Sequence, residues 1–256
     1  MSAGRLEARI SALTHRGVVR TRNEDTIAVE SWIRSASMNG PYTVSFPLVA
    51  GVVCLVADGM GGHAAGHIAS DLAARTILAG KDGLLSADDV SLMVASAGDA
   101  IYQAMTEHPE HAGMGTTIAG LVLQEDRVIW FNVGDSPVFS YSNGFLRQRS
   151  IDDVSQGHDG GTETRSRAIT QSLGGTLSPV AICPHVGVDE GTPEPGTRFL
   201  LCSDGITDML SLRAIEAAIS DDDMATVEAL FSQAMKAGGI DNISIVLVSI
   251  ERGKSE

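Results

Sequence analysis

The chain contains the stretch Val52-Val-Cys-Leu-Val-Ala-Asp58-Gly59-Met60-Gly61-Gly62-His63, in which an apolar run meets a carboxylate and a glycine cluster. The run is rich in β-branched residues, which is typical of a strand buried on both faces, and the glycines let the backbone turn sharply behind it. Residues 68–78 then repeat apolar side chains at near-helical spacing, so a strand, an acidic turn and a helix are predicted. Asp58 is either an ordinary turn residue or a ligand-binding group on a rigid strand end.

The same combination of apolar strand and acidic end recurs along the chain. Residues 198–205, Arg198-Phe-Leu-Leu-Cys-Ser203-Asp204-Gly205, repeat it closely. Further strands are predicted over residues 26–29, 127–133 and 243–250, and an aspartate stands within two residues of one end of each. The aspartates at predicted strand ends are Asp25, Asp58, Asp135, Asp204 and Asp241. This recurrence favours a shared function over unrelated turns.

The length and composition favour one folded domain. A chain of 256 residues buries roughly three-quarters of the surface that its unfolded form exposes, so it needs no cross-link for stability. No internal repeat of fixed period and no clear linker divide the chain. We therefore expect a single domain over residues 1–256.

Charge and cysteine usage restrict the compartment and the partners. The 32 acidic and 18 basic residues give a net charge of −14, which argues against nucleic-acid binding and favours metal cations. The widely spaced Cys54, Cys183 and Cys202 suit a reducing cytosol. Residues 1–10 do not resemble a signal peptide, and the longest apolar segment, residues 46–57, is too short for a bilayer. We expect a cytoplasmic protein without membrane association.

The order of predicted elements is strands, two helices, strands, two helices and a final strand. Because helices and strands do not alternate regularly, an α+β layered sandwich with antiparallel sheets is favoured over a doubly wound fold. Ser86 and Asp89 resemble a capping box at the start of the second helix. Two segments are expected to be irregular: an excursion over residues 30–50 and a short, polar, mobile loop over residues 150–167.

Converging carboxylates require a cation. Two unit charges ~4 Å apart repel by about 4 kcal/mol at an effective dielectric near 20. Hard ions such as Mg²⁺ or Mn²⁺ prefer carboxylate and carbonyl oxygens, and two such ions can activate a bridging water for in-line attack on a phosphoryl group. The sequence lacks a phosphate-binding P-loop and a serine nucleophile elbow, so no protein nucleophile is predicted.

Three basic side chains lie near the acidic motifs. Arg20 is either a clamp for phosphate oxygens or a solvated surface charge. His63 and His67 have the four-residue spacing of a zinc-ligand pair, but no glutamate follows His63 and no third ligand is evident. Ordinary polar helix residues are therefore the favoured interpretation of both histidines.

Together these motifs resemble the bacterial members of the metal-dependent serine/threonine protein phosphatase family known as PP2C or PPM. Taken in family order, they are Arg20-Thr-Arg-Asn-Glu-Asp25, Asp58-Gly-Met-Gly-Gly-His63, Gly115-Thr-Thr117, Gly134-Asp-Ser136, Ile169-Thr-Gln-Ser-Leu-Gly174, Cys202-Ser-Asp-Gly205 and Asp241-Asn242. The resemblance implies a four-layer αββα sandwich, in which two antiparallel β-sheets are flanked by antiparallel helix pairs. It also implies hydrolysis of phosphoserine and phosphothreonine in proteins by a metal-activated bridging water.

The resemblance assigns a role to each motif residue. Asp58 would bridge two Mn²⁺ or Mg²⁺ ions, with the Gly59 carbonyl completing one site and Asp204 and Asp241 the other. Asp135 and Asp204 would form a third metal site, and Asp25 would act near the ions directly or through water. Arg20 would bind the phosphate group. Glu24 and Asn242 would lie around the metal ligands without holding the ions themselves. The expected partners are phosphorylated proteins that are substrates of a bacterial Ser/Thr kinase. We expect the protein to be a monomer.

Two residues depart from the family pattern. Met60 stands where some animal relatives carry a histidine proposed as general acid, so the leaving group must be protonated by water or another group. Pro137 replaces the arginine that usually follows Gly-Asp-Ser, beside the third metal site. Alternative functions are a catalytically weak module of the same fold that binds phosphoproteins, and a metal-dependent phosphodiesterase.

Overall fold

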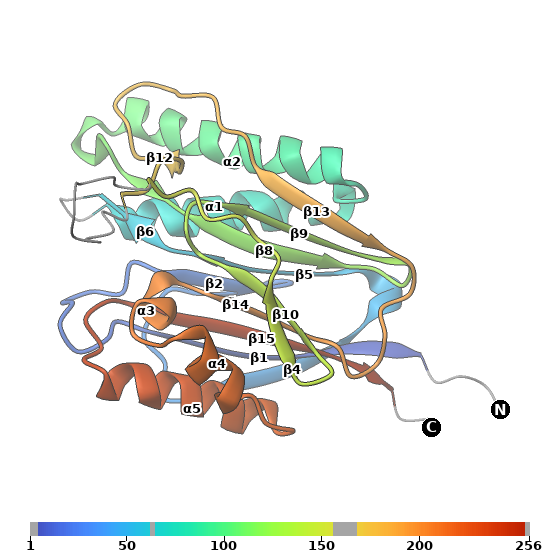
Figure 1. Cartoon of the computed structure of the whole chain (residues 1–256). Coiled ribbons are helices and arrows are strands. Elements are labelled where there is room, and N and C mark those ends of the chain that lie inside the picture. Colours follow the sequence, from blue (N-terminus) through green and yellow to red (C-terminus); the bar gives the residue numbers. More distant parts are fainter. Residues whose placement is uncertain (1–4, 62–64, 156–167, 254–256) are drawn as a thin grey trace.

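Two six-stranded sheets lie face to face in the computed structural model, which describes residues 5–61, 65–155 and 168–253 (Figure 1). In order across it, the first sheet contains β11 (Phe145–Gln148), β10 (Val138–Ser142), β14 (Arg198–Cys202), β15 (Ile243–Arg252), β1 (Leu6–His15) and β4 (Tyr42–Pro47). The second contains β13 (His185–Glu190), β9 (Arg127–Val133), β8 (Ile118–Leu123), β5 (Val52–Ala57), β2 (Thr26–Val29) and β3 (Trp32–Arg34). All their neighbouring strands are antiparallel.

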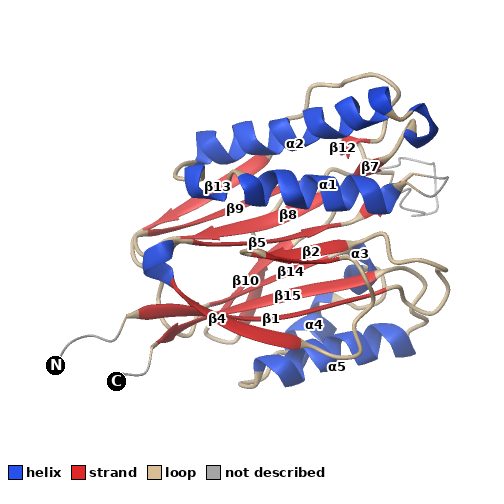
Figure 2. Ribbon diagram, turned by 180° about the vertical axis from the view of Figure 1, so that it is seen from behind, coloured by secondary structure: helices blue, strands red, loops and turns tan. Residues whose placement is uncertain are grey.

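Helices cover the outer face of each sheet, as Figure 2 shows from behind. Helices α1 (Gly66–Ala79) and α2 (Ala87–Glu107) cover the second sheet, while α4 (Leu212–Ala218) and α5 (Asp223–Lys236) cover the first. The predicted cap of α2 is present, because the Ser86 hydroxyl accepts a hydrogen bond from the Asp89 N–H. The four-layer αββα arrangement predicted for the fold is therefore confirmed.

Strand β5 is buried on both faces, as its apolar run predicts. Alternate side chains of a strand point to opposite faces of a sheet. Val52, Cys54 and Val56 therefore join the core between the two sheets, whereas Val53 and Leu55 join the core beneath α1 and α2. The strand that ends at Asp58 is thus fixed by packing from both sides.

The expectation of an irregular excursion over residues 30–50 is wrong. This segment forms β3, β4 and the short 3₁₀ helix Leu48–Ala50, whose Leu48 is fully buried. β3 and β4 are edge strands, and most of their residues are partly or fully exposed. Their weak apolar alternation follows from this position, because an edge strand buries less of its surface than a central one.

A further edge strand, β13, was not expected in the sequence between residues 175 and 197. Gly187 interrupts its apolar pattern, and a side chain there would overlap the ring of Trp130 on β9. Of the loop predicted over residues 150–167, the structure describes only residues 150–155, and the rest of that prediction lies outside the described residues. Within the described ranges, no helix is both long and apolar enough to cross a bilayer.

Candidate active site

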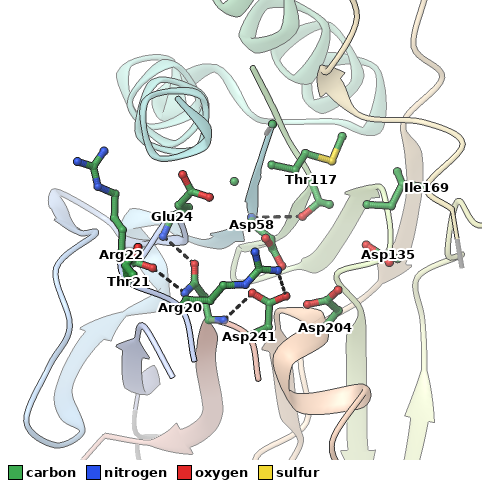
Figure 3. A pocket seen from close by; sticks show the side chains of 14 residues that line it. Arg20, Thr21, Arg22, Glu24, Asp58, Thr117, Asp135, Ile169, Asp204 and Asp241 are labelled. Carbon is green, nitrogen blue, oxygen red and sulfur yellow. Dashed lines mark hydrogen bonds and ion pairs between the residues drawn. The ribbon is translucent and has the colours of Figure 1, made fainter. Parts of the chain in front are cut away.

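The predicted strand ends meet at a pocket of about 590 Å³, at the same end of both sheets (Figure 3). Asp58 follows β5, Asp135 follows β9 after one glycine, and Asp204 opens the one-turn helix α3 (Asp204–Thr207) behind β14. The lining residues are Arg20, Thr21, Arg22, Glu24, Asp58, Gly59, Met60, Gly61, Thr117, Asp135, Ile169, Asp204, Asp241 and Asn242. All the site residues predicted from sequence, except Asp25, therefore line one pocket.

Asp25 lies fully buried beside the pocket. Its Oδ2 accepts a hydrogen bond of 2.7 Å from the Ser244 hydroxyl, while its Oδ1 has no hydrogen-bond partner among the described residues. The pKa of Asp25 is raised to about 7, chiefly by burial and also by the charge of Asp204, while the hydrogen bond from Ser244 opposes this rise. An unpartnered, buried carboxylate oxygen is costly unless a cation or a proton offsets it.

Asp58 stands at the centre of the acidic cluster. Its pKa is raised well above the usual range, chiefly by desolvation in the surrounding protein and then by the charges of the neighbouring aspartates, which are Asp25, Asp204, Asp241 and Asp135. The Asp58 carbonyl accepts hydrogen bonds of 2.9 Å from the Thr117 N–H and the Thr116 hydroxyl. The backbone of Asp58 is thereby fixed to the segment that carries Gly115-Thr-Thr117.

Arg20 reaches into the acidic cluster from the loop between β1 and β2. Its guanidinium lies 2.6 Å from Asp241, and this hydrogen bond, with the charges of Asp241, Asp58 and Glu24, raises the pKa of Arg20. Arg22 instead contacts the His67 ring, with its Nη1 3.1 Å from Nδ1, so it points away from the aspartates (Figure 3). Of the two histidines interpreted as ordinary polar helix residues, His67 lies on α1, and His63 lies outside the described residues.

Asn242 connects the two loops that carry Arg20 and Asp241. Its amide nitrogen donates to the carbonyls of Arg16 and Arg22 at 3.1 and 2.9 Å, and its Oδ1 accepts from the Glu24 N–H at 2.7 Å. Both the nitrogen and the oxygen of the Asn242 side chain are therefore hydrogen-bonded to the loop that carries Arg20. Glu24 itself lines the pocket with its side chain.

The donor set fits hard divalent cations. The pocket brings together Asp58, Asp135, Asp204 and Asp241, and oxygen donors of this kind suit Mg²⁺ and Mn²⁺. Across the described part of the chain, no three His, Cys, Asp or Glu side chains alone are grouped closely enough to hold one ion. Mg²⁺ in proteins keeps several waters and takes one or two carboxylates. The unpartnered oxygen of Asp25 adds an uncompensated acceptor to the same region.

Asp153 was not identified from the sequence, although it supports the turn that carries Asp135. Its Oδ2 accepts from the Gly134 N–H at 2.9 Å, its own N–H donates to the Gly134 carbonyl, and its Oδ1 lies 2.9 Å from His185 Nε2. These contacts join residues far apart in sequence, and Asp153 lies in a segment with few apolar residues. No local pattern could have revealed them; only the pairing of β9 with β13 brings His185 close.

The two departures from the family pattern have different environments. Met60 lines the pocket beside Gly59. Pro137 lies outside it and lines a second hollow of about 420 Å³ together with Asp152, Leu210 and Leu212. Its carbonyl accepts a hydrogen bond from the Cys202 N–H, so the residue before β10 is joined to the end of β14, the strand that leads to Asp204.

Comparison with known proteins agrees with this geometry. Residues 42–238 match the sequence profile of the protein phosphatase 2C family. The chain belongs to this family. It is 29% identical over 255 residues to the serine/threonine protein phosphatase PstP of Mycobacterium tuberculosis, covering 96% of this chain and 45% of PstP. It is 28% identical over 257 residues to the serine/threonine phosphatase Stp of Listeria monocytogenes, covering 92% of this chain and 93% of Stp.

A solved structure of a protein phosphatase 2C relative holds metal ions. The catalytic domain of the serine/threonine protein phosphatase PstP, in complex with two manganese ions, superposes with a TM-score of 0.76 at 28% identity. The match covers 96% of this chain and 99% of that domain. The present chain thus spans less than half the length of full PstP, but nearly all of its catalytic domain. The family contains a metal-dependent site for two ions.

Proposed function

We propose that this protein is a metal-dependent phosphatase that removes phosphate from phosphoserine and phosphothreonine residues of other proteins. The observation that carries the proposal is the convergence of Asp58, Asp135, Asp204 and Asp241 on one pocket that also contains Arg20. The phosphatase names of its relatives support the same activity. We further propose that the protein is a cytoplasmic monomer with one domain and that it opposes a bacterial Ser/Thr kinase.

Each pocket residue has a proposed part in the reaction. Asp58, the Gly59 carbonyl, Asp204 and Asp241 would hold two Mn²⁺ or Mg²⁺ ions, and Asp135 with Asp204 a third. When bound, such ions supply an activated water and neutralise the charge of the phosphoryl group.

The remaining residues act on the substrate and on the loops. Arg20 binds the phosphate oxygens with its guanidinium, a group whose planar fork suits bidentate contact. Asp25, which is buried beside the pocket, would act near the ions directly or through water. Glu24 and Asn242 hold the Arg20 loop in place, and Met60 cannot donate a proton to the leaving group.

One assay tests the proposal against its alternatives. Phosphate release is measured from a phosphothreonine peptide, an aryl phosphate and a phosphodiester, each with Mn²⁺ and with a chelator. We expect hydrolysis of the first two substrates only, and only with metal. Binding of the phosphopeptide without turnover would instead indicate a catalytically idle recognition module, and preferential diester cleavage a phosphodiesterase.

A further inference from the structure

Three exposed aliphatic residues lie one or two positions before a pocket-lining residue in the chain. Val18 and Val19, in the loop between β1 and β2, are 58% and 62% exposed, and Ile240, in the loop between α5 and β15, is 53% exposed. We call these three residues the aliphatic rim. Single exposed aliphatic residues need no explanation, whereas larger contiguous apolar patches with a polar border mark interaction sites.

The two loops of the aliphatic rim are joined by backbone contacts. The N–H groups of Val18 and Val19 both donate to the carbonyl of Gly239, at 2.8 and 3.3 Å. A side chain on Gly17, whose φ is +74°, would overlap the carbonyl of Asp241, so the loops can approach this closely only with glycine there. A Cβ on Gly239 would lie 2.9 Å from Val18 Cγ2, so Val18 packs directly over this glycine.

The aliphatic rim is continuous with the catalytic pocket. Arg20 directly follows Val19, Asp241 directly follows Ile240, and these two pocket residues form the ion pair of 2.6 Å. The two loops that carry the rim are therefore the same loops that bring Arg20 and Asp241 into the pocket. A ligand that occupies both places must carry a phosphate group and an apolar group a short distance apart.

The substrate itself meets this description. A phosphorylated side chain in the pocket remains attached to its polypeptide, which must leave across the edge of the pocket. An extended chain advances about 3.3 Å per residue, so the residues that flank the phosphorylated one pass close to the loops that carry Arg20 and Asp241. The net charge of −14 disfavours an anionic membrane or a second copy of this chain as the occupant.

We propose that the aliphatic rim binds an aliphatic side chain located one or two residues from the phosphorylated residue of a protein substrate. The proposal rests on the proposed phosphatase function and adds a preference for apolar flanking sequence. Burial of such a side chain against the rim removes apolar surface of both partners from water, which favours binding. Arg20 and the aspartates then select the phosphate, and the rim selects its neighbour.

The test compares phosphothreonine peptides that differ at a single position. Four peptides carry leucine at one of the two positions before or after the phosphothreonine, and a fifth carries serine at all four. For the unchanged protein with Mn²⁺, we expect at least one leucine peptide to exceed the serine peptide by roughly tenfold in kcat/KM, mainly through KM. In the triple variant Val18→Ser, Val19→Ser, Ile240→Ser, this ratio should fall to near one.

Because the ratio is measured within one protein, it does not depend on the fraction of folded enzyme. Ile240→Ser alone, expected to lower the ratio in part, serves if the triple variant does not fold. Leu92→Ser, which replaces a 69% exposed leucine on α2, is the matched control and should keep the full ratio. An equal ratio in the unchanged protein and the rim variants overturns the proposal while aryl phosphate is still hydrolysed. Absence of all hydrolysis overturns the phosphatase function itself, and the rim proposal with it.

Discussion

Arg20 Nη2 lies 2.6 Å from Asp241 Oδ2, and this ion pair joins the proposed phosphate-binding residue to a proposed metal ligand. The other oxygen of Asp241 accepts a hydrogen bond of 2.8 Å from the Asn242 N–H, so the carboxylate is held from two sides. Incoming phosphate must share the guanidinium with Asp241 or displace it. Arg20 therefore affects both substrate binding and the charge of the acidic cluster.

Replacement of Arg20 by alanine should weaken substrate binding. Charge-assisted hydrogen bonds to phosphate are lost, so KM for an aryl phosphate should rise about ten- to a hundredfold, with a smaller effect on kcat. Steady-state kinetics with Mn²⁺ measure this split. Arg75→Ala, which removes an exposed arginine paired with Asp71 on α1, is the control and should change neither constant. An unchanged KM in Arg20→Ala would remove Arg20 from the site.

Replacement of Asp58 by asparagine should lower the activity but raise the stability of the metal-free protein. Loss of a metal-holding carboxylate should reduce hydrolysis by at least about a hundredfold, and the rise in Tm on adding Mn²⁺ should shrink. In chelator, the same variant should unfold at a higher temperature than the original protein, because it lacks a desolvated carboxylate among like charges. Asp82→Asn, at a 94% exposed aspartate, is the control for both measurements. Full activity in Asp58→Asn would contradict the proposed mechanism.

The acidic cluster should make stability depend on pH. The pKa of Asp25 is raised from 3.8 to about 7, so between these values the folded protein holds a proton that the unfolded chain has lost. In chelator, the free energy of unfolding should therefore fall as pH rises from about 4 to about 7. With Mn²⁺ the fall should be smaller, because the ion binds the deprotonated form. Denaturant titrations at several pH values test this, and Asp25→Asn should flatten the slope in chelator. Identical slopes with and without metal would argue against an ion at this cluster.

Asp153 should stabilise the turn that carries Asp135. Asp153→Ala removes the acceptor of the Gly134 N–H and the partner of His185, so the free energy of unfolding should fall by about 1–3 kcal/mol. Asp126→Ala removes only an exposed ion pair with Arg127, and should cost less than about 1 kcal/mol. Chemical denaturation of both variants gives the comparison. Equal stability losses would show that the contacts of Asp153 are no stronger than a surface pair.

Local sequence patterns predicted the central part of the fold. β5 and β14 could be identified because strands buried on both faces are continuous apolar runs, and Asp58 follows β5 directly while Asp204 follows β14 after Ser203. β4 and β13 could not be identified, because edge strands expose much of their surface and lose the alternation of apolar and polar residues that marks a strand. The supporting role of Asp153 depends on contacts with Gly134 and His185, which only the folded chain creates. The roles of the individual site residues stay predictions.

The packing of β5 on both faces restricts substitutions in this strand, whereas exposed loop residues are free to vary. Asp58 is attached to a strand whose every side chain is enclosed, so a substitution there disturbs one of two cores. Val18, Val19 and Ile240 lie on solvent-facing loops and can be exchanged without disturbing either core. If the proposed functions of the pocket and the rim hold, descendants of this sequence can acquire new protein targets through a few surface substitutions while inheriting the same hydrolytic centre.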